Sequence, residues 1–180
     1  MSHQRRLPFL LTLLLALGWT FTPINPPLTS AGDIVNDPKG FHGIQWGASL
    51  ANVPGLTLVQ SLERVDEYEI KEAPLQLGDA KADSVRFFTI DGGFGRVTIR
   101  YRGKKTHDSV LAYLQSQFGP ADRTPGSMMR GLNQQFNWRG ADTEVNLTYE
   151  AKQERGHLFI ESRTLSPRFS DALADTGSGS

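Results

Sequence analysis

Three histidines beyond the first 31 residues, His42, His107 and His157, are the side chains best suited to acid–base chemistry. A general base must lie within hydrogen-bond reach of the group whose proton it takes. His107, Asp108 and Ser109 adjoin in the chain, but consecutive residues of a helix do not face one another, so they form no triad. A hydrolase would instead need His107 or His157 with a carboxylate that the fold brings close.

A second group of side chains could bind an anion. Arg96, Arg100 and Arg102 alternate along a predicted strand, and Lys104 and Lys105 follow at once. Alternate residues of a strand stand roughly 7 Å apart on one face, so these cations suit a polyanion such as lipopolysaccharide phosphate, or an acidic partner. The ordinary alternative is a solvated face whose arginine stems cover apolar surface and whose guanidinium groups pair with nearby carboxylates. We take these five residues as the candidate partner-binding face.

Standard motifs of catalytic and cofactor sites are missing from the sequence. It has no Gly-x-Ser-x-Gly, His-Glu-x-x-His or Gly-x-x-x-x-Gly-Lys string. The absence of cysteine excludes disulfides, Cys-based zinc sites, a thiol nucleophile and a lipid-modified N-terminal cysteine. Asp91-Gly92-Gly93 offers one carboxylate, whereas a calcium loop spaces several acids over about a dozen residues, so we expect a turn there. We predict no catalytic residues, no cofactor and no metal.

Composition and charge describe an ordinary single domain. The chain has 180 residues, of which 38% are hydrophobic, and 19 basic side chains balance 19 acidic ones. This length suits one domain, and a neutral balance gives no sign of nucleic-acid binding. We therefore expect no nucleic-acid partner.

The most distinct predicted element is a helix over 106–118. Its apolar side chains recur at three- and four-residue spacing at Val110, Leu111, Leu114 and Phe118. Thr106 is the expected N-cap, Asp108 falls in the expected first turn, and Gly119 followed by Pro120 ends the helix.

The other segments alternate apolar and polar residues and predict antiparallel strands with one polar face. The expected strands cover 41–46, 56–62, 68–72, 84–90, 94–102, 134–138, 143–149 and 157–165. The strands on either side of Asp91-Gly92-Gly93 form the expected hairpin. A helical turn over 49–53 would give two halves, each a helix followed by a strand meander. The predicted fold class is α+β, an antiparallel sheet with one clear helix.

The string Gly40-Phe41-His42-Gly43-Ile44-Gln45-Trp46-Gly47 resembles the opening of small secreted bacterial proteins of uncharacterised function. Their pattern is Gly-Phe-x-Gly-x-x-Trp-Gly, followed by a Pro-Gly turn, strands and a helix that ends at glycine. The resemblance covers about 40–165. At the level of the fold, the layout also resembles β-lactamase inhibitor proteins and small outer-membrane-assembly lipoproteins. The resemblance to small secreted bacterial proteins implies a location and a fold, and neither resemblance implies an activity.

The first thirty-one residues are typical of a secretory signal peptide. Arg5 and Arg6 precede an uncharged apolar run over 7–21, which is shorter than the roughly 20 residues of a membrane span, and a cleavage site follows Ala31. The predicted layout is then a signal peptide (1–31), a leading loop (32–40), one α+β domain (41–165) and a flexible tail (166–180). We expect a periplasmic or secreted protein with no transmembrane span after cleavage; the alternative is an uncleaved anchor.

These patterns favour an exported, non-catalytic binding or adaptor domain that contacts an envelope protein or an anionic glycolipid through its exposed sheet face. Two alternatives stay open. One is a periplasmic hydrolase with a histidine–carboxylate pair, and the other is a structural envelope protein held by its N-terminal anchor.

Overall fold

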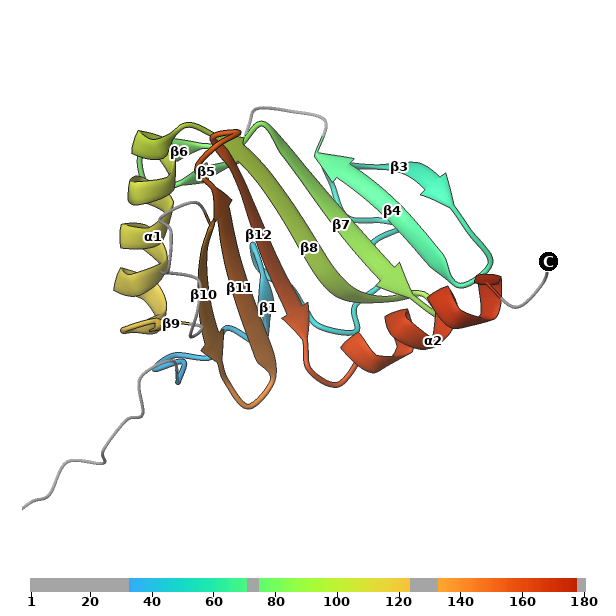
Figure 1. The fold of residues 1–180 in the computed structure, drawn as a ribbon. Helices are drawn as coiled ribbons and strands as arrows, with labels where there is room; N and C mark the ends of the chain where they lie inside the picture. Colours follow the sequence, from blue (N-terminus) through green and yellow to red (C-terminus); the bar gives the residue numbers. More distant parts are fainter. Residues whose placement is uncertain (1–32, 71–74, 124–132, 178–180) are drawn as a thin grey trace, which may run out of the picture.

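The computed structural model describes residues 33–70, 75–123 and 133–177, which form an α+β fold around one eight-stranded antiparallel sheet (Figure 1). The sheet order is β3-β4-β7-β8-β12-β11-β10-β9, and two small hairpins, β1-β2 and β5-β6, lie outside it. The strands are β1 (Gly40–Phe41), β2 (Ile44–Gln45), β3 (Leu56–Ser61), β4 (Val65–Ile70), β5 (Gln76–Leu77), β6 (Ala80–Lys81), β7 (Ser84–Ile90), β8 (Gly93–Arg102), β9 (Asp122–Arg123), β10 (Asn133–Arg139), β11 (Thr143–Glu150) and β12 (Arg155–Ser162). The helices are α1 (Lys104–Phe118) and α2 (Ser166–Gly177). The fold class is the one that the sequence pattern predicts.

Two strand meanders meet in the middle of the sheet. One runs β3-β4-β7-β8 and the other β9-β10-β11-β12, and β8 pairs with β12 along almost its whole length. The hairpin of β7 and β8 turns at Asp91 and Gly92, whose φ angles of 51° and 80° suit the tight turn predicted there. Strands that are far apart in the chain therefore become neighbours at the centre of the sheet.

One face of the sheet carries the main core, and we call it the covered face. Along β8, Val97, Ile99 and Tyr101 are at most 1% exposed, and they alternate with Thr98 and Arg100 on the other face. The β5-β6 hairpin and α1 cover this face at one end, and the N-terminal hairpin covers it at the other, where Phe41 meets Phe87. The opposite face, which we call the open face, keeps the polar residues of β4, β7, β8, β12, β11 and β10.

Helix α1 begins two residues earlier than predicted. Gly103, at φ 90°, is the N-cap, and the helix has neither a side-chain cap bond nor an acidic residue in its first turn. The predicted cap at Thr106 is therefore wrong, because a glycine in a left-handed conformation turns the chain into the helix directly after β8. Asp108 instead forms an ion pair with Lys104, which lies one turn earlier in the helix. The predicted end at Gly119, with φ 89°, is confirmed.

The predicted flexible tail is wrong for most of its length, because Ser166–Gly177 forms helix α2. Phe169 and Ala172 are buried and pack against Ile90, which closes a second, smaller core on the open face. Gly95 allows this contact, since a Cβ atom there would lie 2.8 Å from the Phe169 ring. In Figure 1, α2 lies beside the lower ends of β7 and β8.

The predicted helical turn over 49–53 is also wrong. Gly47 N–H donates to Phe94 O and Phe94 N–H donates to Ala48 O, both at 2.8 Å, so this segment is tied to β8. Only a turn closed by Val53 N–H and Leu50 O remains before the chain enters β3. The molecule has two meanders, but the helix expected at 49–53 before the first of them does not form.

Within the described ranges, no helix combines the length and the apolar character needed to cross a bilayer. The predicted signal peptide over 1–31 lies outside the described residues.

Candidate functional site

The open face carries a cluster of cationic side chains where β8 ends and β12 begins. The register of these strands places Arg102 directly opposite Arg155, and Arg100 directly opposite His157. The three arginines are exposed and His157 is half-buried. Two chain segments that share no sequence motif thus bring their cations to one end of the sheet.

These four residues line a cleft of about 340 Å³, which we call the arginine cleft. Its lining consists of Asp83, Ser84, Arg100, Tyr101, Arg102, Arg155, Gly156 and His157. These residues come from three adjoining strands, because β8 pairs with β12 on one side, and on the other Asp83 N–H, just before β7, donates to Arg100 O at 2.7 Å.

Positive charge in the arginine cleft is only weakly compensated. Arg102 contacts Asp83 at 3.6 Å, and both side chains are more than half exposed. In the part of the chain that the structure describes, Arg100 and Arg155 have neither an ion pair nor a side-chain hydrogen bond; Glu150 is opposite Arg155 on β11, but the two form no ion pair. Like charges opposite each other in a sheet destabilise it, so the cluster is unfavourable for folding alone.

Arg96 shares the strand and the face of Arg100 but does not belong to the cleft. Its guanidinium donates to Glu161 at 2.9 Å, and their side chains are only 25% and 17% exposed. Its Cζ also lies 4.4 Å from the centroid of the Phe169 ring on α2. Arg96 therefore lies apart from the other predicted cations, because a carboxylate and a helix already occupy its side chain, and its part in a partner-binding face stays a prediction.

Lys104 and Lys105 do not reach the arginine cleft either. Both are exposed on α1, which packs with the covered face, and Lys104 pairs with Asp108. The backbone reverses its path at Gly103, so continuing the chain past β8 does not continue the face of the strand. Of the five predicted residues, Arg100 and Arg102 are the two that lie in the cleft.

Sequence reasoning missed Arg155 altogether, and it considered His157 as a hydrolase residue but not as a neighbour of the arginines. Arg155 precedes the strand that we predicted from 157, and His157 lies at its end. The available signal is the alternation of Arg155, His157 and Phe159 on one face, but it does not reveal which strand lies alongside. Only the β8–β12 pairing shows that the two sets of cations are adjacent.

The packing beneath the cleft depends on Tyr101. Its ring lies against Gly156, where a Cβ atom would come within 2.0 Å of two ring carbons. Its hydroxyl is 2.7 Å from Nδ1 of His107, whose Nε2 is 3.2 Å from Oε1 of Gln134. The neutral His107 ring fits this arrangement by accepting at Nδ1 from the Tyr101 hydroxyl and donating from Nε2 to Gln134.

The histidines lie in three separate environments. His107 is 0% exposed and stacks on Tyr149 at a centroid distance of 4.3 Å, and burial lowers its pKa. Its ring partners are a tyrosine and a glutamine rather than the carboxylate that a hydrolase needs. His42 is exposed in the turn between β1 and β2, while His157 lines the arginine cleft. Across residues 33–70, 75–123 and 133–177, no group of three or more potential metal-ligating side chains comes together.

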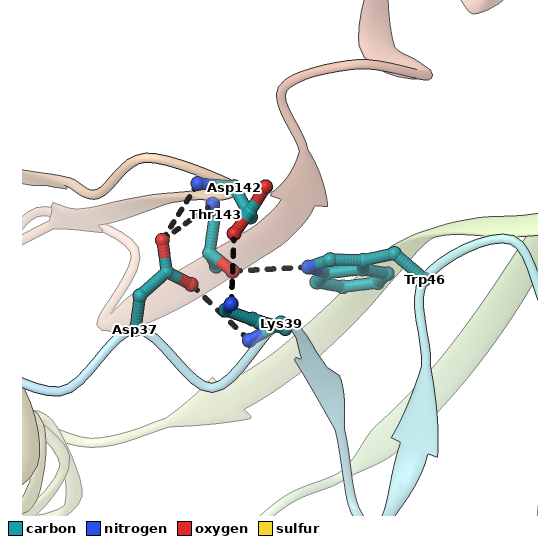
Figure 2. Close-up of polar contacts among 5 residues, drawn as sticks. All are labelled: Asp37, Lys39, Trp46, Asp142 and Thr143. Atoms are coloured by element: carbon teal, nitrogen blue, oxygen red, sulfur yellow. Dashed lines mark hydrogen bonds and ion pairs between the residues drawn. The ribbon is translucent and has the colours of Figure 1, made fainter.

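A second cleft, of about 450 Å³, lies at the other end of the sheet near Trp46. Figure 2 shows that three of its lining residues, Lys39, Trp46 and Asp142, already have polar partners within the protein. Lys39 and Asp142 form an ion pair at 3.8 Å, and Trp46 Nε1–H donates to the Thr143 hydroxyl at 3.0 Å. Because these groups bond to one another, this region is better explained as an attachment of the N-terminal segment than as a ligand site.

Asp37 is the centre of that attachment. Its carboxylate accepts from the backbone N–H groups of Asp142 at 2.7 Å and Thr143 at 3.1 Å, and also from that of Lys39 (Figure 2). Burial on its own would raise the pKa of Asp37, but the hydrogen bonds, led by the one with the Thr143 side chain, lower it below its ordinary value. A carboxylate held by several donors is stable in its ionised form.

Comparisons with protein-family models, with curated proteins and with solved structures found no match. The likeness of residues 40–47 to small secreted bacterial proteins therefore stays a prediction. In this chain, the segment has a packing role, since Phe41 lies against Phe87 and Trp46 against Phe94, with ring centroids 6.0 Å and 4.8 Å apart.

Proposed function

We propose that this protein is an exported, non-catalytic binding domain that recognises an anionic component of the cell envelope, either a protein or a glycolipid. The arginine cleft is the observation that carries the proposal. Three exposed guanidinium groups and an imidazole converge there, and Asp83 is the carboxylate that contacts one of them.

The energetic argument starts from the cost of the cluster. Cross-strand pairs of like charge destabilise a sheet by a few tenths of a kcal/mol to about 1 kcal/mol. An anion bound between Arg100, Arg102 and Arg155 would offset this repulsion. It would also accept charge-assisted hydrogen bonds, which are about twice as strong as neutral ones. Residues that oppose folding but favour a ligand are typical of binding sites.

The export part of the proposal depends on residues 1–31, whose charged start, apolar run and small-residue end favour a signal peptide. N-terminal sequencing of the protein recovered from the envelope fraction tests it. A chain that begins at Gly32 is expected; a chain that still carries residues 1–31 would support the anchored structural protein instead.

The binding part is tested by crosslinking in the native host, with mass spectrometry of the captured molecules. We compare the wild-type protein with the double variant Arg100→Gln/Arg155→Gln. The matched control, Lys81→Gln/Lys105→Gln, removes the same two charges from exposed positions on β6 and α1, outside the cleft.

We expect the arginine variant to lose most of the crosslinked partner and the lysine variant to keep it. The lysine variant should unfold at the temperature of the wild type, and the arginine variant at the same or a slightly higher temperature, because all four positions are exposed and the arginine variant loses a repulsive cross-strand pair. Equal capture by the two variants would overturn the proposal that the arginine cleft binds the partner.

A further inference from the structure

The arginine cleft is small and confined. Its volume of about 340 Å³ lies near the lower end of the range of roughly 300–1,000 Å³ that is typical of small-ligand sites. Its lining comes from the start of β7 and from the adjoining ends of β8 and β12. Such a space fits a compact group with concentrated negative charge better than it fits a broad protein surface.

An exposed aromatic ring lies next to the cleft on the same face. Phe159 is 38% exposed and follows His157 by two residues along β12, so it stands about 7 Å further along the strand. The other large apolar side chains of β12, Leu158 and Ile160, are buried on the covered face, so Phe159 is the apolar side chain that this strand exposes on the open face. Its apolar surface can pack against the C–H groups on one side of a sugar ring.

Neutral hydrogen-bonding side chains surround Phe159. The register places Thr98 of β8 directly opposite it on one side and Asn146 of β11 on the other. Both are partly exposed on the open face. Hydroxyl and amide groups both donate and accept, as sugar hydroxyls do, whereas an acidic peptide would gain most from further cations at these positions.

We propose that the ligand of the open face is a phosphorylated saccharide. Its phosphate binds between Arg100, Arg102 and Arg155, its sugar ring packs on Phe159, and Thr98 and Asn146 bind its hydroxyls. This inference rests on the proposed function, because it uses the same face and names the chemistry of the anionic component. Two sources share that chemistry: the headgroup of a phosphorylated glycolipid and a free sugar phosphate.

The test measures the affinity of the full protein, purified as an exporting host processes it, for defined probes by calorimetry and NMR titration. The probes are glucose 6-phosphate, glucosamine 1-phosphate, the two unphosphorylated sugars and inorganic phosphate. We expect at least one sugar phosphate to bind about tenfold or more tightly than both inorganic phosphate and its parent sugar, since two groups of contacts then act together.

Variants separate the two parts of the site. Arg100→Gln and Arg155→Gln should each weaken both sugar phosphate and inorganic phosphate by about tenfold, because each removes a charge-assisted contact. Phe159→Ala should weaken the sugar phosphate by roughly fivefold and leave inorganic phosphate unchanged, since it removes only ring packing. Lys81→Gln is the control and should change neither affinity.

Vesicles identify the source of the saccharide. Phosphatidylglycerol vesicles with and without lipid A are sedimented with the protein, with phosphatase-treated lipid A as a third sample. Binding that requires phosphorylated lipid A assigns a glycolipid headgroup, and binding of the free sugar phosphates alone assigns a diffusible ligand; both agree with the proposal.

The proposal is overturned if neither sugar phosphate binds more tightly than inorganic phosphate and vesicle binding does not require phosphorylated lipid A. It is also overturned if Phe159→Ala weakens the sugar phosphate and inorganic phosphate equally. If both the sugar phosphates and lipid A fail while crosslinking still depends on Arg100 and Arg155, the partner is an acidic protein and the proposed function stands. Failure of both measurements removes the proposed function as well.

Discussion

The two ends of the β8–β12 strand pair carry the same residue type in opposite circumstances. At one end, Arg96 is directly opposite Glu161 and lies under Phe169 of α2. At the other end, Arg102 is opposite Arg155, and both side chains are exposed. Arg96 is therefore part of the packing of the domain, whereas Arg102 and Arg155 face the solvent.

The difference shows that the groups around an arginine, and not the arginine itself, decide its role. A guanidinium that pairs with a carboxylate in a half-buried setting is already satisfied, and its aliphatic stem fills space under a ring. An exposed guanidinium without an ion pair among the described residues, such as that of Arg155, or with only a long one, such as that of Arg102 with Asp83, is available to an anion from outside. Substitutions at each end of the strand pair test this contrast.

Gly156→Ala should disrupt the packing beneath the arginine end. The new methyl group would come within 2.0 Å of the buried Tyr101 ring, which cannot move away without breaking its bond to His107. We expect the free energy of unfolding to fall by about 3 kcal/mol or more, the upper range for overpacking. Urea denaturation measures this loss. The same change at Gly92, where nothing lies within 4 Å of a Cβ atom, is the control for backbone strain alone and should cost less.

Phe169→Ala should destabilise the end of the β8–β12 pair where Arg96 lies. The side chain is only 4% exposed and joins α2 to Ile90 and Arg96, so its removal should cost about 3 kcal/mol, the lower range for buried phenylalanine. Hydrogen exchange should show faster exchange in α2 than in α1. An unchanged unfolding midpoint would mean that α2 does not hold this end of the sheet together.

Arg96→Ala and Arg100→Ala compare the two ends directly. The first variant leaves Glu161 unpaired in a half-buried position and should lose about 1–2 kcal/mol of stability. The second removes an unpaired, exposed charge and should stay within about 0.5 kcal/mol of the wild type. Chemical denaturation of both proteins in one buffer provides the comparison. Equal losses would show that the two arginines have the same role.

The buried imidazole below the arginine end should make stability depend on pH. Burial lowers the pKa of His107 in the folded protein, while the unfolded chain keeps an ordinary histidine value near 6.5. Below that pH the unfolded state binds more protons, so the free energy of unfolding should fall as pH drops from 7.5 to 5.5. Urea midpoints of wild type and His107→Gln at both pH values isolate this effect. A variant with the same decrease as the wild type would assign it to other groups.

Much of the architecture can be predicted from patterns of residues that are close in the sequence. The apolar stripe of 106–118 and Gly119 predict α1 and its end, and the alternation around Asp91-Gly92-Gly93 predicts the β7–β8 hairpin. These features succeed because each depends on residues that are close in the chain. The failures at 49–53 and at 166–177 share one cause, since tertiary contacts with Phe94 and Ile90 decide those conformations. The failure at Thr106 is local, because Gly103 turns the chain into the helix before that residue.

The candidate site shows the same division. By itself, the sequence determines which side chains of β8 share a face, because the two-residue period of a strand places Arg96, Arg100 and Arg102 together. Only the tertiary structure decides that β12 lies alongside, that Glu161 pairs with the first of these arginines, and that Arg155 and His157 join the others. The physical reason is that strand pairing depends on the core of the whole sheet. A change of one residue in register would turn the side chains of β12 to the opposite face.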